Sequence, residues 1–145
     1  MNGAEPRKSN EEVTAKAPDD LLAAATTAHG NAYVPYSDFR VGAALRAASG
    51  KIYSGANIEN ASYPMSRCAE QSAIQAMASA GERGFGELVV YTQVSPPATP
   101  CGGCRQVLVE FGEPSVPVYM VNGQGETVVM TLAELLPGAF SLKQV

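Results

Sequence analysis

The chain has 145 residues, of which 46% are hydrophobic and 17% charged, a balance typical of a single soluble globular domain. Its formal net charge is -4 and its basic residues are scattered, so we expect no nucleic-acid partner. No apolar run approaches the roughly 20 residues that cross a bilayer, so we expect no membrane partner. The polar N-terminus is unlike a signal peptide, and three cysteines make a poor disulfide framework. Together these features predict a cytoplasmic protein with reduced thiols.

The predicted elements begin after a polar, charged segment. Residues 1–17 are expected to form a flexible leader, and residues 18–145 a single domain. A helix is predicted from Pro18, because the two aspartates that follow suit the positive end of a helix dipole. Gly30 is expected to end this helix.

Downstream, the chain alternates strand-like and helix-like segments. The pattern predicts, in order, strands at Arg40–Arg46 and Lys51–Ala56, a helix at Ser66–Ala80 and a strand at Leu88–Thr92. It then predicts a helix at Cys101–Phe111, strands at Val116–Val121 and Thr127–Met130, and a short helix from the cap Thr131 through Leu136. Five strands with helices between them indicate a layered α/β domain.

The cysteines are grouped in two short segments, Cys68-Ala69-Glu70 and Pro100-Cys101-Gly102-Gly103-Cys104. A Cys-x-x-Cys pair at the start of a helix presents both sulfurs to one tetrahedral ion. Three thiolates are one ligand short of a closed structural site, which predicts one catalytic zinc with a position left for water. Both segments are expected at helix N-termini, where backbone N–H groups offset the charge of the thiolates. Glu70 then lies beside the metal as a proton shuttle and not as a ligand.

A Cys-x-x-Cys pair alone also fits a structural zinc half-site or a redox pair. A structural zinc site needs a fourth ligand, and the only histidine of the chain is His29. His29 lies at the end of the first predicted helix, and we expect it to be a solvated residue or a C-terminal helix residue and not a metal ligand.

Six segments match a known family in the same order along the chain. They are Tyr33-Val34-Pro35-Tyr36-Ser37-Asp38-Phe39, Val41-Gly42-Ala43-Ala44-Leu45, Gly55-Ala56-Asn57-Ile58-Glu59-Asn60-Ala61-Ser62-Tyr63, Cys68-Ala69-Glu70, Pro100-Cys101-Gly102-Gly103-Cys104-Arg105-Gln106 and Leu135-Leu136-Pro137-Gly138-Ala139-Phe140. Through them, from about residue 32 to residue 140, the sequence resembles the small homotetrameric cytidine deaminases.

The resemblance implies an activity and an assembly. The activity is hydrolytic deamination of cytidine and 2′-deoxycytidine to uridine and 2′-deoxyuridine, with release of ammonia, in pyrimidine salvage. The assembly is a homotetramer with one zinc ion per subunit and active sites shared between subunits. We therefore predict a three-layer α/β/α domain around a five-stranded mixed sheet, with a pyrimidine nucleoside as its small-molecule partner.

The resemblance also implies roles for individual residues. Asn57 and Glu59 are implied to bind the ribose hydroxyls, and side chains two apart on an extended segment do project from one face. Phe39 is implied to pack against the pyrimidine, and the Ala69 N–H to hold the base carbonyl. Glu70 is implied to carry a proton from the attacking water to the ring nitrogen and later to assist the departing amine.

Three further residues, Ala61, Tyr63 and Phe140, are implied to complete the pocket of a neighbouring subunit. Packing within one chain is an alternative for the two aromatic residues, and a place in the core is an alternative for Phe39. The implied ribose-binding pair could instead be ordinary strand-end and turn residues.

One position departs from the family pattern. Gln71 follows Glu70, where small members often carry an arginine that hydrogen-bonds the ligand sulfurs. Glutamine donates to sulfur but brings no positive charge, so we expect a more anionic site and a less acidic zinc-bound water. Arg67, directly before Cys68, is a possible source of compensating charge.

Two other functions stay open at this point. One is a zinc deaminase for a free base, a cytosine-bearing antibiotic or a polynucleotide. The segment Asn57-Ile58-Glu59 favours a nucleoside, and the acidic net charge argues against a polynucleotide. The other is a non-catalytic, zinc-stabilised binding module, for which Glu70 would have no role in turnover.

Overall fold

The computed structural model describes residues 16–143. The predicted leader lies outside this range except for its last two residues. Lys16 is exposed and forms an ion pair with Asp19, with 3.6 Å between the charged atoms. Ala17 is buried and belongs to the same apolar cluster as Leu21 of the first helix, so packed structure begins just ahead of the predicted domain boundary.

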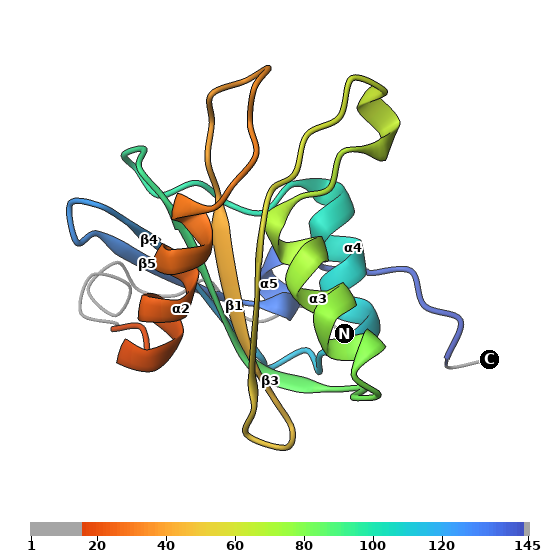
Figure 1. Ribbon diagram of the computed structural model, residues 1–145. Coiled ribbons are helices and arrows are strands. Elements are labelled where there is room, and N and C mark those ends of the chain that lie inside the picture. The colour runs from red at the N-terminus through yellow and green to blue at the C-terminus, as the bar shows by residue number, and fades with distance from the viewer. Residues whose placement is uncertain (1–15, 144–145) are drawn as a thin grey trace.

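Five strands form one sheet in the order β2-β1-β3-β4-β5 (Figure 1). Their bounds are Gly42–Ala47 for β1, Ile52–Ala56 for β2, Phe85–Thr92 for β3, Pro117–Asn122 for β4 and Thr127–Thr131 for β5. β3 and β4 are parallel and the other neighbours are antiparallel. The predicted mixed sheet of five strands is therefore confirmed.

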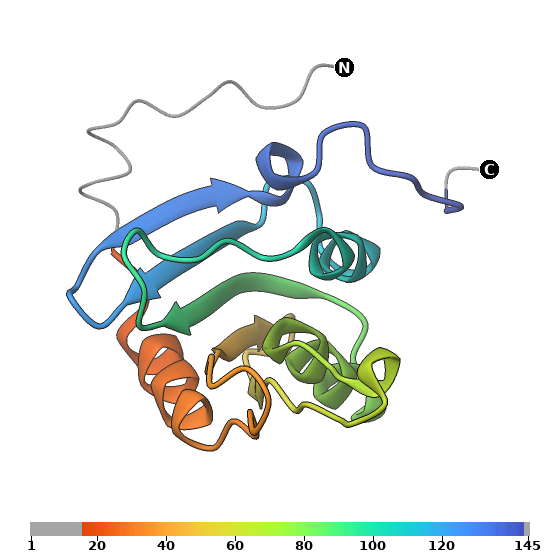
Figure 2. The same ribbon diagram turned by 90° about the horizontal axis from the view of Figure 1, so that it is seen from above.

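The helices lie on both faces of the sheet. They are α2 (Asp19–Gly30), α3 (Ala69–Ser79), α4 (Gly102–Phe111) and the short α5 (Leu132–Leu135). Seen from above in Figure 2, α2 lies on one side of the strands and α3 and α4 on the other. α4 also supplies the crossover that the parallel pair β3–β4 requires. This is the predicted three-layer α/β/α arrangement.

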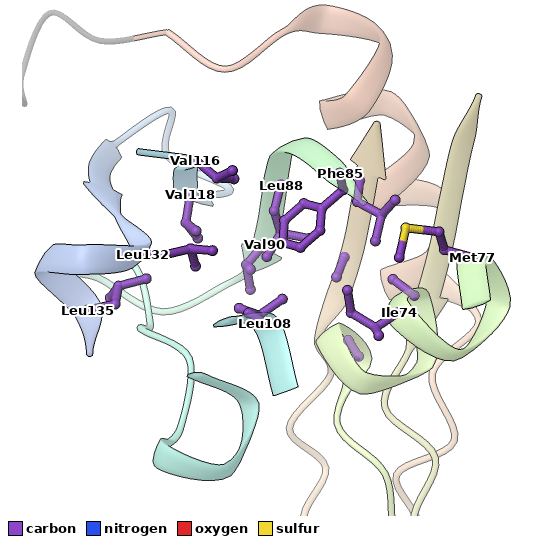
Figure 3. Close-up of a cluster of buried hydrophobic side chains, with 14 of the residues drawn as sticks. Ile74, Met77, Phe85, Leu88, Val90, Leu108, Val116, Val118, Leu132 and Leu135 are labelled. Carbon is purple, nitrogen blue, oxygen red and sulfur yellow. The ribbon is translucent and has the colours of Figure 1, made fainter. Parts of the chain in front are cut away.

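Two apolar clusters fill the spaces between the layers. The larger joins Leu88 of β3 to Ile74 of α3, Leu108 of α4 and Leu132 of α5 (Figure 3). The smaller joins α2 to the opposite face of the strands. Among residues 16–143, no helix combines the length and the apolar character needed to cross a membrane.

The start of α3 differs from the prediction. Residues 66–68 are extended rather than helical, and Cys68 is the N-cap residue with φ -74° and ψ 157°. The cause is a backbone bridge in which the N–H of Ile58 donates to the carbonyl of Arg67 and the N–H of Arg67 donates back, at 3.0 and 2.9 Å. A short 3-10 helix, Tyr63–Met65, precedes this bridge and was not predicted.

α3 presses closely on the edge strand β2. A Cβ atom on Gly55 would lie 2.5 Å from the backbone nitrogen of Ala73, so only glycine allows this approach. α3 also packs beside α4, and both helices begin at the same end of the sheet (Figure 1). Their N-termini, which carry the cysteine segments, are thereby brought together.

Candidate metal centre and active site

The three cysteines of the chain converge where α3 and α4 begin. Cys68 and Cys101 are the N-cap residues of the two helices, both with extended backbone, and Cys104 lies in the first turn of α4. The sulfur of Cys101 lies 4.0 Å from that of Cys68 and 3.4 Å from that of Cys104. All three sulfurs lie within 4.8 Å of one another.

This geometry fits a zinc ion. Zn–S bonds of about 2.3 Å at tetrahedral angles separate the sulfurs by about 3.8 Å, a value between the two sulfur distances above. Among residues 16–143, this is the one group of three or more potential ligands that converges closely enough to hold a metal ion, and Glu70 is not part of it. Three protein ligands leave one tetrahedral position for water or substrate, as in catalytic zinc sites.

The environment of the thiols favours one thiolate and disfavours a second. Hydrogen bonding from Cys104, with a smaller contribution from Cys101, lowers the pKa of Cys68 to about 7, although burial and Glu70 act in the opposite direction. The pKa of Cys104 is raised, first by its interaction with Cys68 and then by burial. A cation is therefore needed to ionise the whole cluster near neutral pH.

Gln71 and Arg67 differ in how they contact this cluster. The side-chain amide of Gln71 donates to the sulfur of Cys104 at 3.6 Å, as the sequence predicted. The guanidinium of Arg67 instead donates to the backbone carbonyls of Pro64 and Ser66, at 3.0 and 2.8 Å. Arg67 lowers the pKa of Cys68 only through its charge, which is the smallest contribution. The expected anionic character of the site is thus largely uncompensated.

Glu70 lies in the first turn of α3 and is only 4% exposed. Burial raises the pKa of its carboxyl group, partly offset by hydrogen bonds from its own backbone N–H and from Cys104. A buried carboxyl with a raised pKa beside an open metal position is suited to accept and return a proton. Ala69, at the first helical position, carries one of the backbone N–H groups that have no acceptor within a helix.

The implied ribose-binding residues are also part of the backbone scaffold. The Asn57 side chain accepts a hydrogen bond from the N–H of Val41 at 2.9 Å and donates one to the carbonyl of Phe39 at 2.8 Å. Glu59 accepts hydrogen bonds from the N–H groups of Tyr36 and Ser37 and from the Ser37 hydroxyl. One amide proton of Asn57 and one lone pair of Glu59 Oε2 remain for a ligand.

The implied aromatic contacts are exposed. Phe39 is 39% exposed, Tyr63 76% and Phe140 69%, and Ala61 is exposed as well. Tyr63 makes an edge contact with Tyr36, with ring centroids 6.4 Å apart. Packing within the described chain therefore does not bury Tyr63 or Phe140, and Phe39 is not a core residue.

His29 lies in the last turn of α2, as the sequence predicted, and its side chain is partly exposed. Its ring meets the edge of Tyr91 with centroids 5.0 Å apart, and its Nε2 atom is buried without a hydrogen-bond partner among residues 16–143. His29 belongs to α2, which lies on the opposite side of the strands from α3 and α4 (Figure 2), and it is not part of the converging ligand group, so it is not a fourth metal ligand.

Arg105 and Ser37 have structural roles near the site that were not predicted from the sequence. Arg105 donates to the carbonyl of Pro100 at 2.8 Å and to that of Leu135 at 2.7 Å, which ties the cysteine loop to α5. The Ser37 hydroxyl contacts Glu59 and the N–H of Phe39. A serine hydroxyl can bond the backbone N–H two residues further on, as in ST-turns, so the latter contact could have been expected from the sequence.

Comparison with known proteins agrees with this site. The family described as "Cytidine and deoxycytidylate deaminase zinc-binding region" matches residues 16–120, which puts the chain among the zinc-dependent deaminases. A cytidine deaminase of Sporosarcina psychrophila is 50% identical over 123 residues, which cover 85% of this chain and 90% of the relative. One of Mycobacterium tuberculosis is 39% identical over 119 residues, which cover 81% and 85%.

Solved structures agree as well. The crystal structure of cytidine deaminase from Burkholderia pseudomallei superposes with a TM-score of 0.82 at 42% identity, covering 86% of this chain and all of that one. The chain belongs to the cytidine deaminase family.

Proposed function

We propose that the chain deaminates cytidine and 2′-deoxycytidine by hydrolysis, giving uridine and 2′-deoxyuridine and releasing ammonia, as a step of pyrimidine salvage. The observation that carries this proposal is the buried carboxyl of Glu70 beside a cluster of three thiols. The names of its relatives support it. In this proposal, residues 18–145 form the single deaminase domain.

The reaction divides into metal binding and proton transfer. Cys68, Cys101 and Cys104 hold the zinc, and when bound this ion supplies the Lewis acidity that makes a water molecule nucleophilic at neutral pH. Glu70 accepts a proton from the attacking water and delivers it to the ring nitrogen of the base. It then assists protonation of the amine that leaves as ammonia. The raised pKa of its carboxyl suits both directions of transfer.

The nucleoside is bound through the scaffold around Asn57 and Glu59. Their remaining amide proton and carboxylate lone pair suit one sugar hydroxyl, which accepts from Asn57 and donates to Glu59. A single recognised hydroxyl is compatible with both the ribose and the deoxyribose nucleoside. Phe39 packs against the pyrimidine, and the Ala69 N–H holds the base carbonyl.

The active unit is proposed to be a homotetramer in the cytoplasm. Supporting this assembly, large apolar side chains are exposed in the 3-10 helix Tyr63–Met65 and in the segment after α5, namely Tyr63, Met65, Phe140 and Leu142. Exposed apolar surface of this kind is found at association sites. In this assembly Ala61, Tyr63 and Phe140 complete the pocket of a neighbouring subunit.

Ammonia release by the zinc-loaded protein tests the function. The substrates are cytidine, 2′-deoxycytidine, free cytosine and a cytosine-containing single strand. Turnover of the two nucleosides alone is expected. Turnover of cytosine or of the single strand alone would overturn the roles of Asn57 and Glu59. Absence of all turnover from a zinc-loaded protein would favour a binding module.

A further inference from the structure

Two segments that are far apart in the sequence form the sugar- and base-binding side of the proposed site. The backbone N–H of Tyr33 donates to the carbonyl of Asn57 at 3.0 Å, and the N–H of Glu59 donates to the carbonyl of Tyr33 at 2.9 Å. These bonds place the loop that carries Phe39 alongside the strand end that carries Glu59. These bonds between backbone groups do not contact the Glu59 side chain.

Ser37 joins the Glu59 side chain to the other segment through two of its groups. Its backbone N–H donates to Glu59 Oε1 at 3.1 Å, and its hydroxyl donates to Oε2. The same hydroxyl oxygen accepts a hydrogen bond from the N–H of Phe39 at 3.0 Å. The left-handed backbone of Asp38, with φ 58°, belongs to the turn that brings this N–H back to Ser37.

The direction of these bonds is fixed by chemistry. An ionised carboxylate only accepts hydrogen bonds, and a backbone N–H only donates. The Ser37 hydroxyl must therefore donate its proton to Glu59, and its oxygen must accept from the Phe39 N–H. A single hydroxyl thus transmits the position of the Phe39 backbone to the Glu59 carboxylate.

The contacts also decide which carboxylate oxygen is free. Both lone pairs of Glu59 Oε1 are used by the N–H groups of Tyr36 and Ser37, at 3.0 and 3.1 Å. Oε2 accepts only the Ser37 hydroxyl among these contacts and keeps one lone pair. The Ser37 hydrogen bond is also the largest of the influences that lower the pKa of Glu59, which keeps this group an acceptor. Without the hydroxyl, the carboxylate is held only through Oε1 by two backbone N–H groups, and no hydrogen bond directs Oε2.

We propose that Ser37 is a positioning residue for nucleoside binding. Its hydroxyl holds the free oxygen of Glu59 and the backbone of Phe39 in a fixed relative position. This role rests on the proposed function, because it acts through the groups that hold the sugar and the base. Ser37 itself touches no reacting atom. Its loss should therefore weaken substrate and transition state alike, which raises KM and leaves kcat nearly unchanged.

The test is steady-state kinetics of zinc-loaded variants with cytidine. Removing a hydrogen bond to a charged group predicts a KM about tenfold to a hundredfold higher for Ser37→Ala. Ser37→Thr keeps the hydroxyl and is expected to restore KM to near the parent value. Ser115→Ala removes an exposed serine at the turn before β4 and is the matched control, with unchanged KM.

A double-mutant cycle separates positioning from general structural support. In a Glu59→Gln background, Ser37→Ala is expected to raise KM only slightly further, because the group through which it acts is already altered. An equal fold-change in both backgrounds would overturn the role. So would a drop in zinc content or melting temperature that accounts for the kinetic loss. If the alanine variant does not fold, Ser37→Cys tests the same bond with a much weaker donor and must also raise KM.

The proposed function and the role of Ser37 can be refuted separately. A zinc-loaded parent that does not turn over cytidine would overturn the proposed function, and the role of Ser37 with it. A parent that turns over cytidine and a Ser37→Ala variant with the same KM would overturn the role of Ser37 alone.

Discussion

Replacing Gln71 by methionine is expected to weaken zinc binding about tenfold. The Gln71 amide donates to the sulfur of Cys104 at 3.6 Å, and Cys104 is 1% exposed. A thiolate at this position has little access to water, so this donor stabilises its charge. Hydrogen bonds to charged groups contribute about 1.5 to 3 kcal/mol. The long N···S distance puts the Gln71 contact at the low end of that range, or about tenfold in affinity.

Methionine is a matched replacement because it keeps the length of the side chain and loses the N–H donors. Gln71→Arg is the opposite perturbation. Three thiolates exceed the charge of one Zn²⁺, so a guanidinium beside Cys104 is expected to tighten zinc binding relative to the parent. Competition with a chromophoric chelator measures the dissociation constant of all three proteins. Equal affinity of the Met variant and the parent would refute the reasoning, as would an Arg variant that binds zinc more weakly.

Three other predictions follow from the packing and the pKa values. Gly42→Ala is expected to lower the melting temperature, because its Cβ would lie 2.0 Å from the carbonyl oxygen of Ala25. Gly86→Ala, with no atom within 4 Å of the added Cβ, is the control and should melt near the parent temperature. Burial, with a smaller contribution from the charge of Arg40, lowers the pKa of His29 in the folded protein. The unfolded chain therefore binds the proton more readily, and the free energy of unfolding should fall as pH drops below about 6.5. Chemical denaturation across pH should show a flatter profile for His29→Gln, and an unchanged profile would contradict this. Removal of zinc by a chelator should make the three thiols reactive toward an alkylating reagent at pH 7. Cys68, whose pKa is lowered to about 7, should react first in mass-spectrometric mapping, and earlier labelling of either other cysteine would contradict its assignment.

The local signals of the sequence predicted most of the fold. The capping box at the start of α5 is present, with the Thr131 hydroxyl and the Glu134 carboxylate each accepting from the other's backbone N–H. The strands follow their apolar runs, although β3 begins three residues earlier than expected, at Phe85. Periodicity carries no information on which strands pair, so the order of the sheet could not be derived from it. The mixed character of the sheet followed only from the resemblance to a family, and the identity of its parallel pair, β3 and β4, was not predicted.

The sequence was less informative where distant segments meet. The spacing of the cysteines and Glu70 predicted a metal centre because each pair lies at the start of one helix. Cys68 and Glu70 lie at the start of α3, and Cys101 and Cys104 at the start of α4. The start of α3 was misplaced because the Ile58–Arg67 bridge, formed by residues nine positions apart, keeps the chain extended. The ring contact of His29 with Tyr91 and the contact of Ser37 with Glu59 likewise depend on tertiary structure. Neither residue type nor local pattern encodes such contacts.

The most direct test of the account is the rate of cytidine deamination by Glu70→Gln beside that of the parent, with zinc content measured on the same samples. Glutamine keeps the size of the side chain and removes its capacity to accept and return a proton. We predict equal zinc content and a kcat at least about a hundredfold lower, the usual contribution of a general acid–base group. A variant that keeps its zinc and turns over cytidine at the parent rate would contradict the role of Glu70 and the mechanism built on it.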